Sequence, residues 1–186
     1  MTLGGPVIWI TGLSGAGKTT VSRTLVDRLR TQGMSPVILD GDIVREALDV
    51  HGGYDRESRH RMAFTYARLC RTFALQGHTV VCSTISLFHD VQEWNRQNID
   101  GYIEVLLDVP LDVLRQRDSK GIYRHGDRHK IVGLGVTPEF PRNPDLVIAN
   151  HDDTSPDRAA REIIEFCAQR DAWRTAHPTT VSRRKK

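Results

Sequence analysis

The stretch GLSGAGKTT, residues 12–20, decides the fold of this chain. It follows the pattern G-x-x-x-x-G-K-[ST], in which glycines let successive backbone amides turn toward a phosphate group. Residues 7–11, VIWIT, precede it as a short apolar, β-branched run that is typical of a strand buried on both faces. Apolar residues then recur at helical spacing up to Gly33, which is suited to closing a helix. A chance glycine-rich turn would lack this strand and helix, so the stretch predicts a phosphate-binding loop.

Within this loop, each part of the motif has an expected task. Lys18 would reach the β and γ phosphates of a nucleotide, and the Thr19 hydroxyl would help to hold Mg²⁺. The start of the following helix adds partial positive charge. We expect the nucleotide to be bound by Gly12, Ser14, Gly15, Ala16, Gly17, Lys18, Thr19 and Thr20.

The composition is that of an ordinary globular domain of 186 residues with a net charge of +3. Cys70, Cys82 and Cys167 are too widely spaced for a disulfide framework or a zinc site, which indicates a reducing, cytoplasmic setting. No signal peptide or membrane span is predicted. The basic tail, about 178–186, is expected to be a frayed, solvated terminus, although contact with nucleic acid or membrane is the alternative.

Strands and helices are expected to alternate along the chain. The second strand, 36–39, ends in Asp40-Gly41-Asp42, where carboxylates would lie at the ligand-binding edge of a parallel sheet. Further strands are predicted at 79–83, 102–109 and 146–148, and helices at 43–48, 55–76, 89–98, from 110 and from 155. The pattern predicts a single α/β domain, residues 1–186, with a doubly wound parallel sheet of five strands.

Six basic residues crowd into the segment 115–130, which is here named the basic segment. They are Arg115, Arg117, Lys120, Arg124, Arg128 and Lys130. The segment is open to three interpretations: a nucleic-acid patch, a solvated loop, or a mobile lid over the phosphates, about 117–140. The patch would need more stacking aromatics than Tyr123, so we favour the lid and expect no nucleic-acid partner. His125 and His129 lie four residues apart in it, but no Glu follows the first, so a metal site is not expected.

Three stretches together resemble the adenylyl-sulfate kinase family. They are the loop 12–20, the stretch LDGDIVR at 39–45 and the stretch RDSKGIY at 117–123, in the family's order. The family has Asn where Ile43 stands, and Pro and Leu where Ser119 and Ile122 stand. The third signature is not shared by P-loop kinases in general, so the resemblance is specific.

The resemblance implies transfer of the γ-phosphoryl group of ATP, with Mg²⁺, to the 3′-hydroxyl of an acceptor nucleotide. Asp42 would orient or deprotonate that hydroxyl, while Mg²⁺, Lys18 and the basic lid would neutralise charge on the transferring group. Lys120 would bridge the donor and acceptor phosphates. Arg117 would lie over ATP, and Tyr54 would stack on the acceptor base. The acceptor residues map onto Asp40, Arg45, Tyr54, Arg59, Met62, Ile85, Ser86, Leu87, His89 and Lys120. Members of the family are often dimers, so a homodimer is a further expectation.

The acceptor side departs from the family pattern. Met62 stands where the family has Asn, Leu87 where it has Pro and His89 where it has Arg. Residues 86–96 look like a branch of the family in which some members phosphorylate cytidine diphosphoramidate. The acceptor is therefore left open between adenylyl sulfate and a cytidine diphosphate derivative. A non-catalytic nucleotide-binding module is the alternative of another class, whereas a switch GTPase would need an Asn-Lys-x-Asp motif, which is absent.

Overall fold

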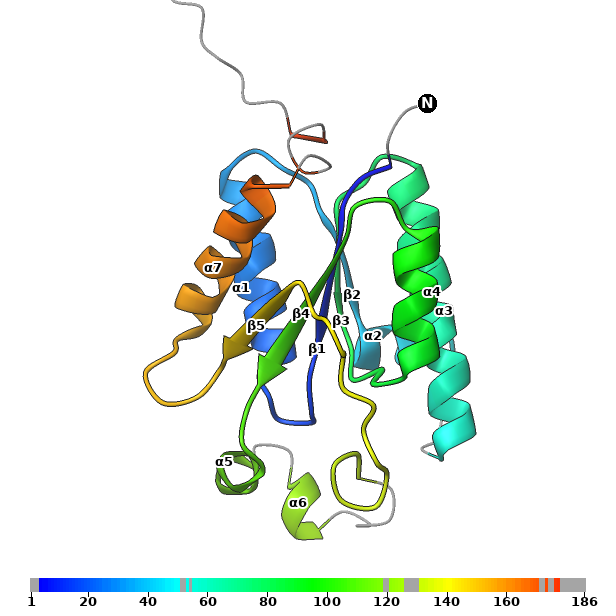
Figure 1. Ribbon diagram of the computed structural model, residues 1–186, viewed down its shortest axis with the longest axis vertical. Helices are drawn as coiled ribbons and strands as arrows, with labels where there is room; N and C mark the ends of the chain where they lie inside the picture. The colour runs from blue at the N-terminus through cyan, green and yellow to red at the C-terminus, as the bar shows by residue number, and fades with distance from the viewer. Residues whose placement is uncertain are drawn as a thin grey trace, which may run out of the picture.

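The computed structural model describes residues 4–50, 53, 55–118, 121–125, 131–170, 173, 176 and 177. Its strands form one parallel sheet in the order β2-β3-β1-β4-β5 (Figure 1). The elements are β1 (Val7–Thr11), α1 (Lys18–Thr31), β2 (Val37–Asp40), α2 (Gly41–Ala47), α3 (Arg56–Leu75), β3 (Val80–Ser83), α4 (His89–Asn98), β4 (Tyr102–Asp108), α5 (Leu111–Arg117), α6 (Ile122–His125), β5 (Leu146–Ala149) and α7 (Pro156–Ala168).

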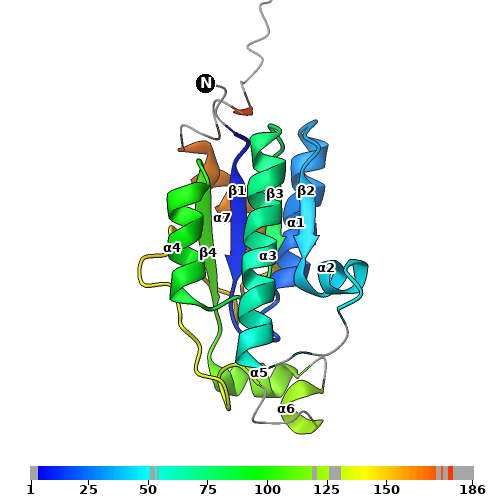
Figure 2. The same ribbon diagram turned by 90° about the vertical axis from the view of Figure 1, so that its right-hand side faces the viewer.

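Helices cover both faces of this sheet. Helices α1 and α7 pack together on one face, and α3 and α4 pack on the other (Figures 1 and 2). All five residues of the central strand β1 are buried, which explains why its sequence is a continuous apolar run rather than an alternating one. The predicted fold class, a doubly wound α/β sheet of five parallel strands, is confirmed.

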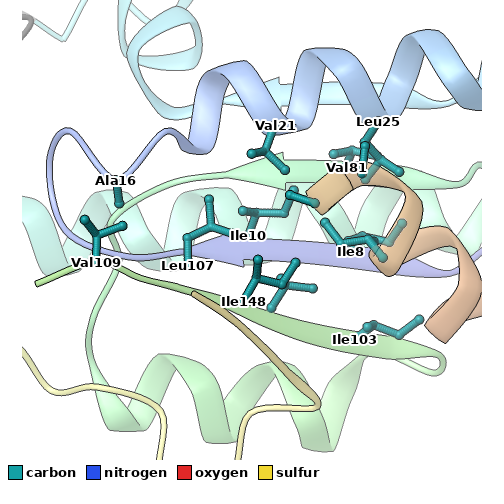
Figure 3. Close-up of a cluster of buried hydrophobic side chains, with 14 of the residues drawn as sticks. Ile8, Ile10, Ala16, Val21, Leu25, Val81, Ile103, Leu107, Val109 and Ile148 are labelled. Carbon is teal, nitrogen blue, oxygen red and sulfur yellow. The ribbon is translucent and has the colours of Figure 1, made fainter. Parts of the chain in front are cut away.

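The side chains on the two faces of β1 contribute to two separate hydrophobic cores. Ile8 and Ile10 point toward α1 and α7, where they pack with Val81 and Leu107 (Figure 3). Val7 and Trp9 point the other way, into the cluster beneath α3 and α4. Alternate strand residues face opposite sides, so β1, β2, β3 and β4 contribute to both cores, whereas β5 contributes to the first alone. The sheet is thereby held rigidly, and its carboxyl edge forms a fixed base for the loops.

The Asp-Gly-Asp stretch both ends a strand and starts a helix. Strand β2 ends at Asp40, one residue later than the sequence predicted. The side chain of Asp40 then caps α2 by accepting a hydrogen bond of 3.1 Å from the Asp42 amide. The cap turns the chain sharply at the sheet edge, so Asp42 lies in the first turn of α2.

The predicted lid, about 117–140, contains more regular and buried structure than the sequence indicated. It contains the short helix α6, which was not predicted, and Tyr123, Ile131 and Val132 are buried in the core around β1. Residues 119–120 and 126–130 of the predicted lid lie outside the described residues, as does the tail 178–186.

Three further expectations concern cysteines, metals and membranes. Cys70, Cys82 and Cys167 are all buried and free. In the described part of the chain, no three side chains of His, Cys, Asp or Glu are grouped so that they could hold a metal ion. None of the helices that the structure describes is both long and apolar enough to cross a bilayer.

Candidate nucleotide site

The loop between β1 and α1 depends on glycine at two positions. Gly12 has φ of 147°, and a Cβ atom there would lie 2.7 Å from the carbonyl oxygen of Leu107. Gly17 has φ of 89°, and a Cβ atom there would lie 2.6 Å from Nδ2 of Asn150. Any side chain at either position would be strained and would collide with a neighbour. The glycines therefore let the loop curl tightly against the ends of β4 and β5.

Two side chains from distant parts of the chain hold the loop from outside. Nδ2 of Asn150, just after β5, donates a hydrogen bond of 2.7 Å to the carbonyl of Ala16. The hydroxyl of Tyr123, in α6, donates one of 2.8 Å to the carbonyl of Ser14. Arg117 donates through Nη1 to the carbonyl of Asn150 at 2.9 Å. Arg117 is thus linked to the loop through Asn150.

Positive charge gathers where the loop enters α1. Nζ of Lys18 donates to the carbonyls of Gly12 and Leu13, at 3.0 and 2.7 Å. Gly17, the N-cap of α1, provides no side chain that could cap the helix, so no carboxylate or hydroxyl of the cap competes for the first amides. The ammonium group and the helix start together form a site suited to the anionic phosphates of a nucleotide.

Asp40 receives hydrogen bonds from three directions. Its Oδ2 accepts from the hydroxyls of Thr19 at 2.7 Å and Ser83 at 2.9 Å, and Oδ1 accepts from the Asp42 amide. The residue is only 5% exposed. Burial raises the pKa of this carboxyl, but the hydrogen bonds from Thr19, Ser83 and the amides of Asp42 and Ile43 outweigh it, so the pKa is lowered overall. Asp40 is therefore an ionised carboxylate at neutral pH.

The pair of Thr19 and Asp40 fits a magnesium ion. Both supply oxygen atoms, which Mg²⁺ prefers, and the Asp40 carboxylate is ionised. Mg²⁺ in kinases is held by one or two protein oxygens, water and substrate phosphates rather than by a dedicated cage. A hydroxyl and a carboxylate beside the phosphate loop meet that requirement.

One cavity of about 310 Å³ lies at the carboxyl edge of the sheet, between the loop and α3. Most predicted site residues line it, namely Ser14, Gly15, Gly17, Lys18, Thr19, Thr20, Asp40, Asp42, Arg45, Arg59, Met62, Ile85, Ser86 and Leu87. Gly12, Ala16, Arg117 and His89 are not among the lining residues. Tyr54 and Lys120 lie outside the described residues. The structure thus brings the phosphate loop and most of the predicted acceptor residues together around one space.

The cavity is also lined by residues that were not predicted. They are Gly41, Tyr66, Ser83, Thr84, Phe88, Ile131, Val132, Val136 and Thr137. Two of them carried a usable signal. Tyr66 follows Arg59 and Met62 at helical spacing, and Ser83 ends the third strand as Asp40 ends the second, with the two residues paired in register.

Tyr66 joins α3 to the start of α2. Its hydroxyl donates a hydrogen bond of 3.0 Å to the carbonyl of Gly41, the residue before Asp42. Burial, which outweighs the neighbouring Arg45, raises the pKa of Tyr66 to about 12. The hydroxyl therefore remains a donor at any pH at which the protein would be assayed, and it helps to fix the position of Asp42.

Residues 84–88, which include the predicted acceptor residues Ile85, Ser86 and Leu87, all line the cavity and are here named the acceptor wall. The hydroxyls of Thr84 and Ser86 lie 2.8 Å apart, and the Thr11 hydroxyl donates to the carbonyl of Ile85. Ser86 has φ of 28°, a backbone conformation that is rare for a residue with a side chain. Such conformations persist where surrounding contacts impose them, often at functional sites.

His89 points away from the cavity lining. Its Nε2 lies 2.9 Å from the carbonyl of Phe140. A carbonyl can only accept, so this nitrogen carries the proton. Residues 131–140, which lead from the basic segment back toward the sheet, are here named the returning segment. The structure therefore places His89 between the acceptor wall and the returning segment, rather than among the cavity residues.

Comparison with known proteins agrees with this geometry. The model of the adenylylsulphate kinase family matches residues 4–149. A cytidine diphosphoramidate kinase of Campylobacter jejuni subsp. jejuni serotype O:2 is 38% identical over 146 residues, which are 77% of this chain and 85% of that protein. An adenylyl-sulfate kinase of Clostridium kluyveri is 35% identical over 166 residues, 87% of this chain and 83% of that protein.

A solved structure shows the same relationship in three dimensions. The APS kinase CysC of Mycobacterium tuberculosis, in complex with AMPPNP and APS, superposes with a TM-score of 0.80 at 30% sequence identity. The match covers 89% of this chain and 99% of that one. The chain therefore belongs to the adenylylsulphate kinase family of nucleotide-binding P-loop kinases.

Proposed function

We propose that this kinase transfers the γ-phosphoryl group of ATP to the ribose 3′-hydroxyl of a nucleotide that is modified at its 5′ end. The observation that carries the proposal is the shared cavity. Lys18 and Thr19, which would bind the donor, line the same cavity as Asp42 and Arg59, which would bind the acceptor. Donor and acceptor would therefore meet in one space, as in-line phosphoryl transfer requires.

The donor side would stabilise the charge of the phosphates. The ammonium group of Lys18 and the start of α1 would offset negative charge on the transferring group. Thr19 and Asp40 would hold Mg²⁺, which supplies charge neutralisation between the phosphates when it is bound. Lys120, by resemblance to the family, would add a further cation.

The acceptor side would orient the hydroxyl. Asp42 lies in the first turn of α2, which Asp40 caps and Tyr66 holds through the carbonyl of Gly41. Its carboxylate would accept the proton of the 3′-hydroxyl as the new bond to phosphorus forms and the bond from the γ phosphorus to the bridging oxygen breaks, which releases ADP. Arg45 and Arg59 also line the cavity and would bind the anionic 5′ group of the acceptor.

Two acceptors fit the family, and one observation favours a cytidine diphosphate derivative over adenylyl sulfate. Met62 and Leu87 both line the cavity, at positions where the family pattern has Asn and Pro. Met62 is only 7% exposed, so a polar contact at this position would be replaced by a buried thioether. Loss of a buried polar partner discriminates strongly between substrates. The relatives support both acceptors alike, because the Campylobacter jejuni cytidine diphosphoramidate kinase is 38% identical and the Clostridium kluyveri adenylyl-sulfate kinase is 35% identical.

A direct comparison of the two acceptors would test the proposal. ADP release is measured with Mg·ATP and either adenylyl sulfate or cytidine diphosphoramidate, and phosphorus NMR locates the new phosphate. Turnover with a phosphate at the ribose 3′ position supports the proposal, and the better acceptor identifies the substrate. No turnover with either would contradict it and would favour a nucleotide-binding module.

The assembly and the setting are separate proposals. Resemblance to the family leads us to propose a homodimer, which light scattering would detect as a particle of twice the chain mass. The three buried free cysteines suit a reducing, cytoplasmic compartment. A monomer in solution at micromolar concentration would contradict the proposed homodimer.

A further inference from the structure

Two segments that line the cavity depend on each other for their position. Val136 and Thr137 come from the returning segment, and Leu87 and Phe88 from the acceptor wall. Neither stretch belongs to a strand of the sheet, and an isolated bridge between Val132 and Val136 lies within the returning segment. Contacts between the two segments therefore add to the core packing that holds each of them in place.

Glu139 supplies several of those contacts, beside the hydrogen bond from Nε2 of His89 to the carbonyl of Phe140. Its backbone amide donates to the carbonyl of Leu87 at 3.1 Å, and its carbonyl accepts from Nε2 of Gln92 at 2.9 Å. Its side-chain Oε2 accepts from the backbone amide of His89 at 2.8 Å, and Oε1 pairs with Arg56 at the start of α3. One residue thus bonds the returning segment to α3, α4 and the acceptor wall.

The carboxylate also replaces a missing helix cap. Helix α4 begins at His89, and its N-cap residue, Phe88, has a side chain that cannot accept a hydrogen bond. The first turn of a helix needs an acceptor and favours negative charge. Asp90 in the first turn accepts a hydrogen bond from the Val91 amide, and Glu139, from another segment of the chain, accepts one from the first amide, that of His89. Without Glu139, the His89 amide at the junction between the acceptor wall and α4 would lose its acceptor.

Arg56 completes the arrangement. Its guanidinium lies 5.1 Å from the centre of the Phe88 ring while it pairs with Glu139. The cation therefore contacts both the carboxylate and the aromatic residue at the end of the acceptor wall. Hydrogen bonding from the His89 amide and the proximity of Arg56 lower the pKa of Glu139, so its carboxylate is ionised at neutral pH.

We propose that Glu139 is a positioning residue for the acceptor, which acts by holding the acceptor wall against α4 and the returning segment. The inference rests on the proposed function. Glu139 is not among the residues that line the cavity, so it would act through Leu87 and Phe88 rather than on the substrate. Its loss should weaken binding of the acceptor while binding of ATP at the loop 12–20, to which Glu139 makes no hydrogen bond among the described residues, is spared.

Steady-state kinetics of three variants would test this. Glu139→Ala removes the cap and the ion pair, and we expect it to raise the KM for the acceptor about fivefold, the equivalent of about 1 kcal/mol for a lost cap. Glu139→Gln keeps an oxygen that can accept from His89 and should have a smaller effect. Glu57→Gln removes a charge that pairs with Arg61 on the exposed surface of α3 and should change nothing.

The KM values separate positioning from general damage. A rise in the acceptor KM with an unchanged KM for ATP supports the proposal. An unchanged acceptor KM in Glu139→Ala would overturn it, and so would an equal rise in both KM values.

Hydrogen exchange provides a readout that does not require turnover. We expect Glu139→Ala to accelerate exchange of the amides of residues 87–92, while exchange in the loop 12–20 stays as in the wild type. Glu57→Gln should leave exchange in both regions as in the wild type. Unchanged exchange at 87–92 would overturn the role of Glu139. If the wild type phosphorylated neither nucleotide, the proposed function would fail, whereas the exchange result would still decide whether Glu139 holds the wall.

Discussion

The hydroxyl of Thr19 donates a hydrogen bond of 2.7 Å to Oδ2 of Asp40. This bond joins the phosphate loop to the end of β2, although the two residues are 21 positions apart in the chain. Thr19 belongs to the donor side of the site, and Asp40 caps the helix that carries Asp42. The two halves of the proposed reaction are therefore coupled through one carboxylate.

Replacement of Asp40 should reduce the free energy of unfolding at neutral pH but not in acid. Asp40→Asn removes an ionised acceptor from a buried network, and we expect unfolding at pH 7 to become easier by about 2 kcal/mol. The pKa of Asp40 is lowered in the fold, so its stabilisation is complete above the unfolded value of about 4 and is lost as pH falls through the folded value. Urea denaturation at several pH values should show the two proteins converging in acid.

The exposed Asp27 offers a matched control for that experiment. Its side chain is 73% exposed and pairs with Arg30 on the same helix. Asp27→Asn should track the wild type at every pH. A gap between wild type and Asp40→Asn that stays constant down to pH 2 would contradict the assignment.

Lys18 should be needed for turnover and not for folding. We expect Lys18→Ala to lower kcat/KM at least about 100-fold, because a cation that stabilises the transferring phosphoryl group is lost. Circular dichroism should show a folded protein with a similar melting temperature. Arg30→Ala, at the exposed end of the same helix, is the control and should remain active.

Asp42 should affect the chemical step and spare ATP binding. Asp42→Asn keeps the size of the side chain but cannot accept the proton, so kcat should fall about 100-fold or more. The KM for ATP should stay near the wild-type value. Glu46→Gln removes a charge from an exposed position of the same helix and should keep full activity. Full turnover in Asp42→Asn would rule out its role as a base.

Met62 should influence the choice of acceptor more than His89 does. Met62 lines the cavity, whereas His89 bonds to the carbonyl of Phe140. We expect Met62→Asn to raise the ratio of kcat/KM for adenylyl sulfate over the cytidine compound about tenfold. His89→Arg alone should leave that ratio nearly unchanged. The same ratio in wild type and Met62→Asn would exclude this pocket assignment.

Asn150 should support ATP binding without contact to the acceptor side. In Asn150→Asp, a carboxylate would face the carbonyl of Ala16 in place of a donor, and the repulsion should displace the loop. We expect the KM for ATP to rise about tenfold while the KM for the acceptor changes little. The exposed Asn143→Asp is the control. Equal changes in both KM values would indicate general misfolding instead.

Much of the fold was predictable because patterns of neighbouring residues in the sequence determine it. The run 7–11 is apolar and β-branched, and glycines follow it at the spacing that a phosphate loop needs. Strand ends were also informative, since ligands gather at the carboxyl edge of a parallel sheet, and this placed Asp40 and Asp42 near the loop. Helix α6 was missed because it is short and lies within a segment dominated by charge.

The sequence by itself thus determined the kind of fold, the phosphate loop and the carboxylates at the end of β2, because each depends on neighbours along the chain. Only the tertiary structure decided which distant residues support them. The order of the strands brings Ser83 beside Asp40, and the end of β5 brings Asn150 against Ala16. Glu139 reaches His89 only because the returning segment folds back along α4. These contacts depend on which elements become neighbours in space and on where each side chain points, and residue type and spacing do not specify either.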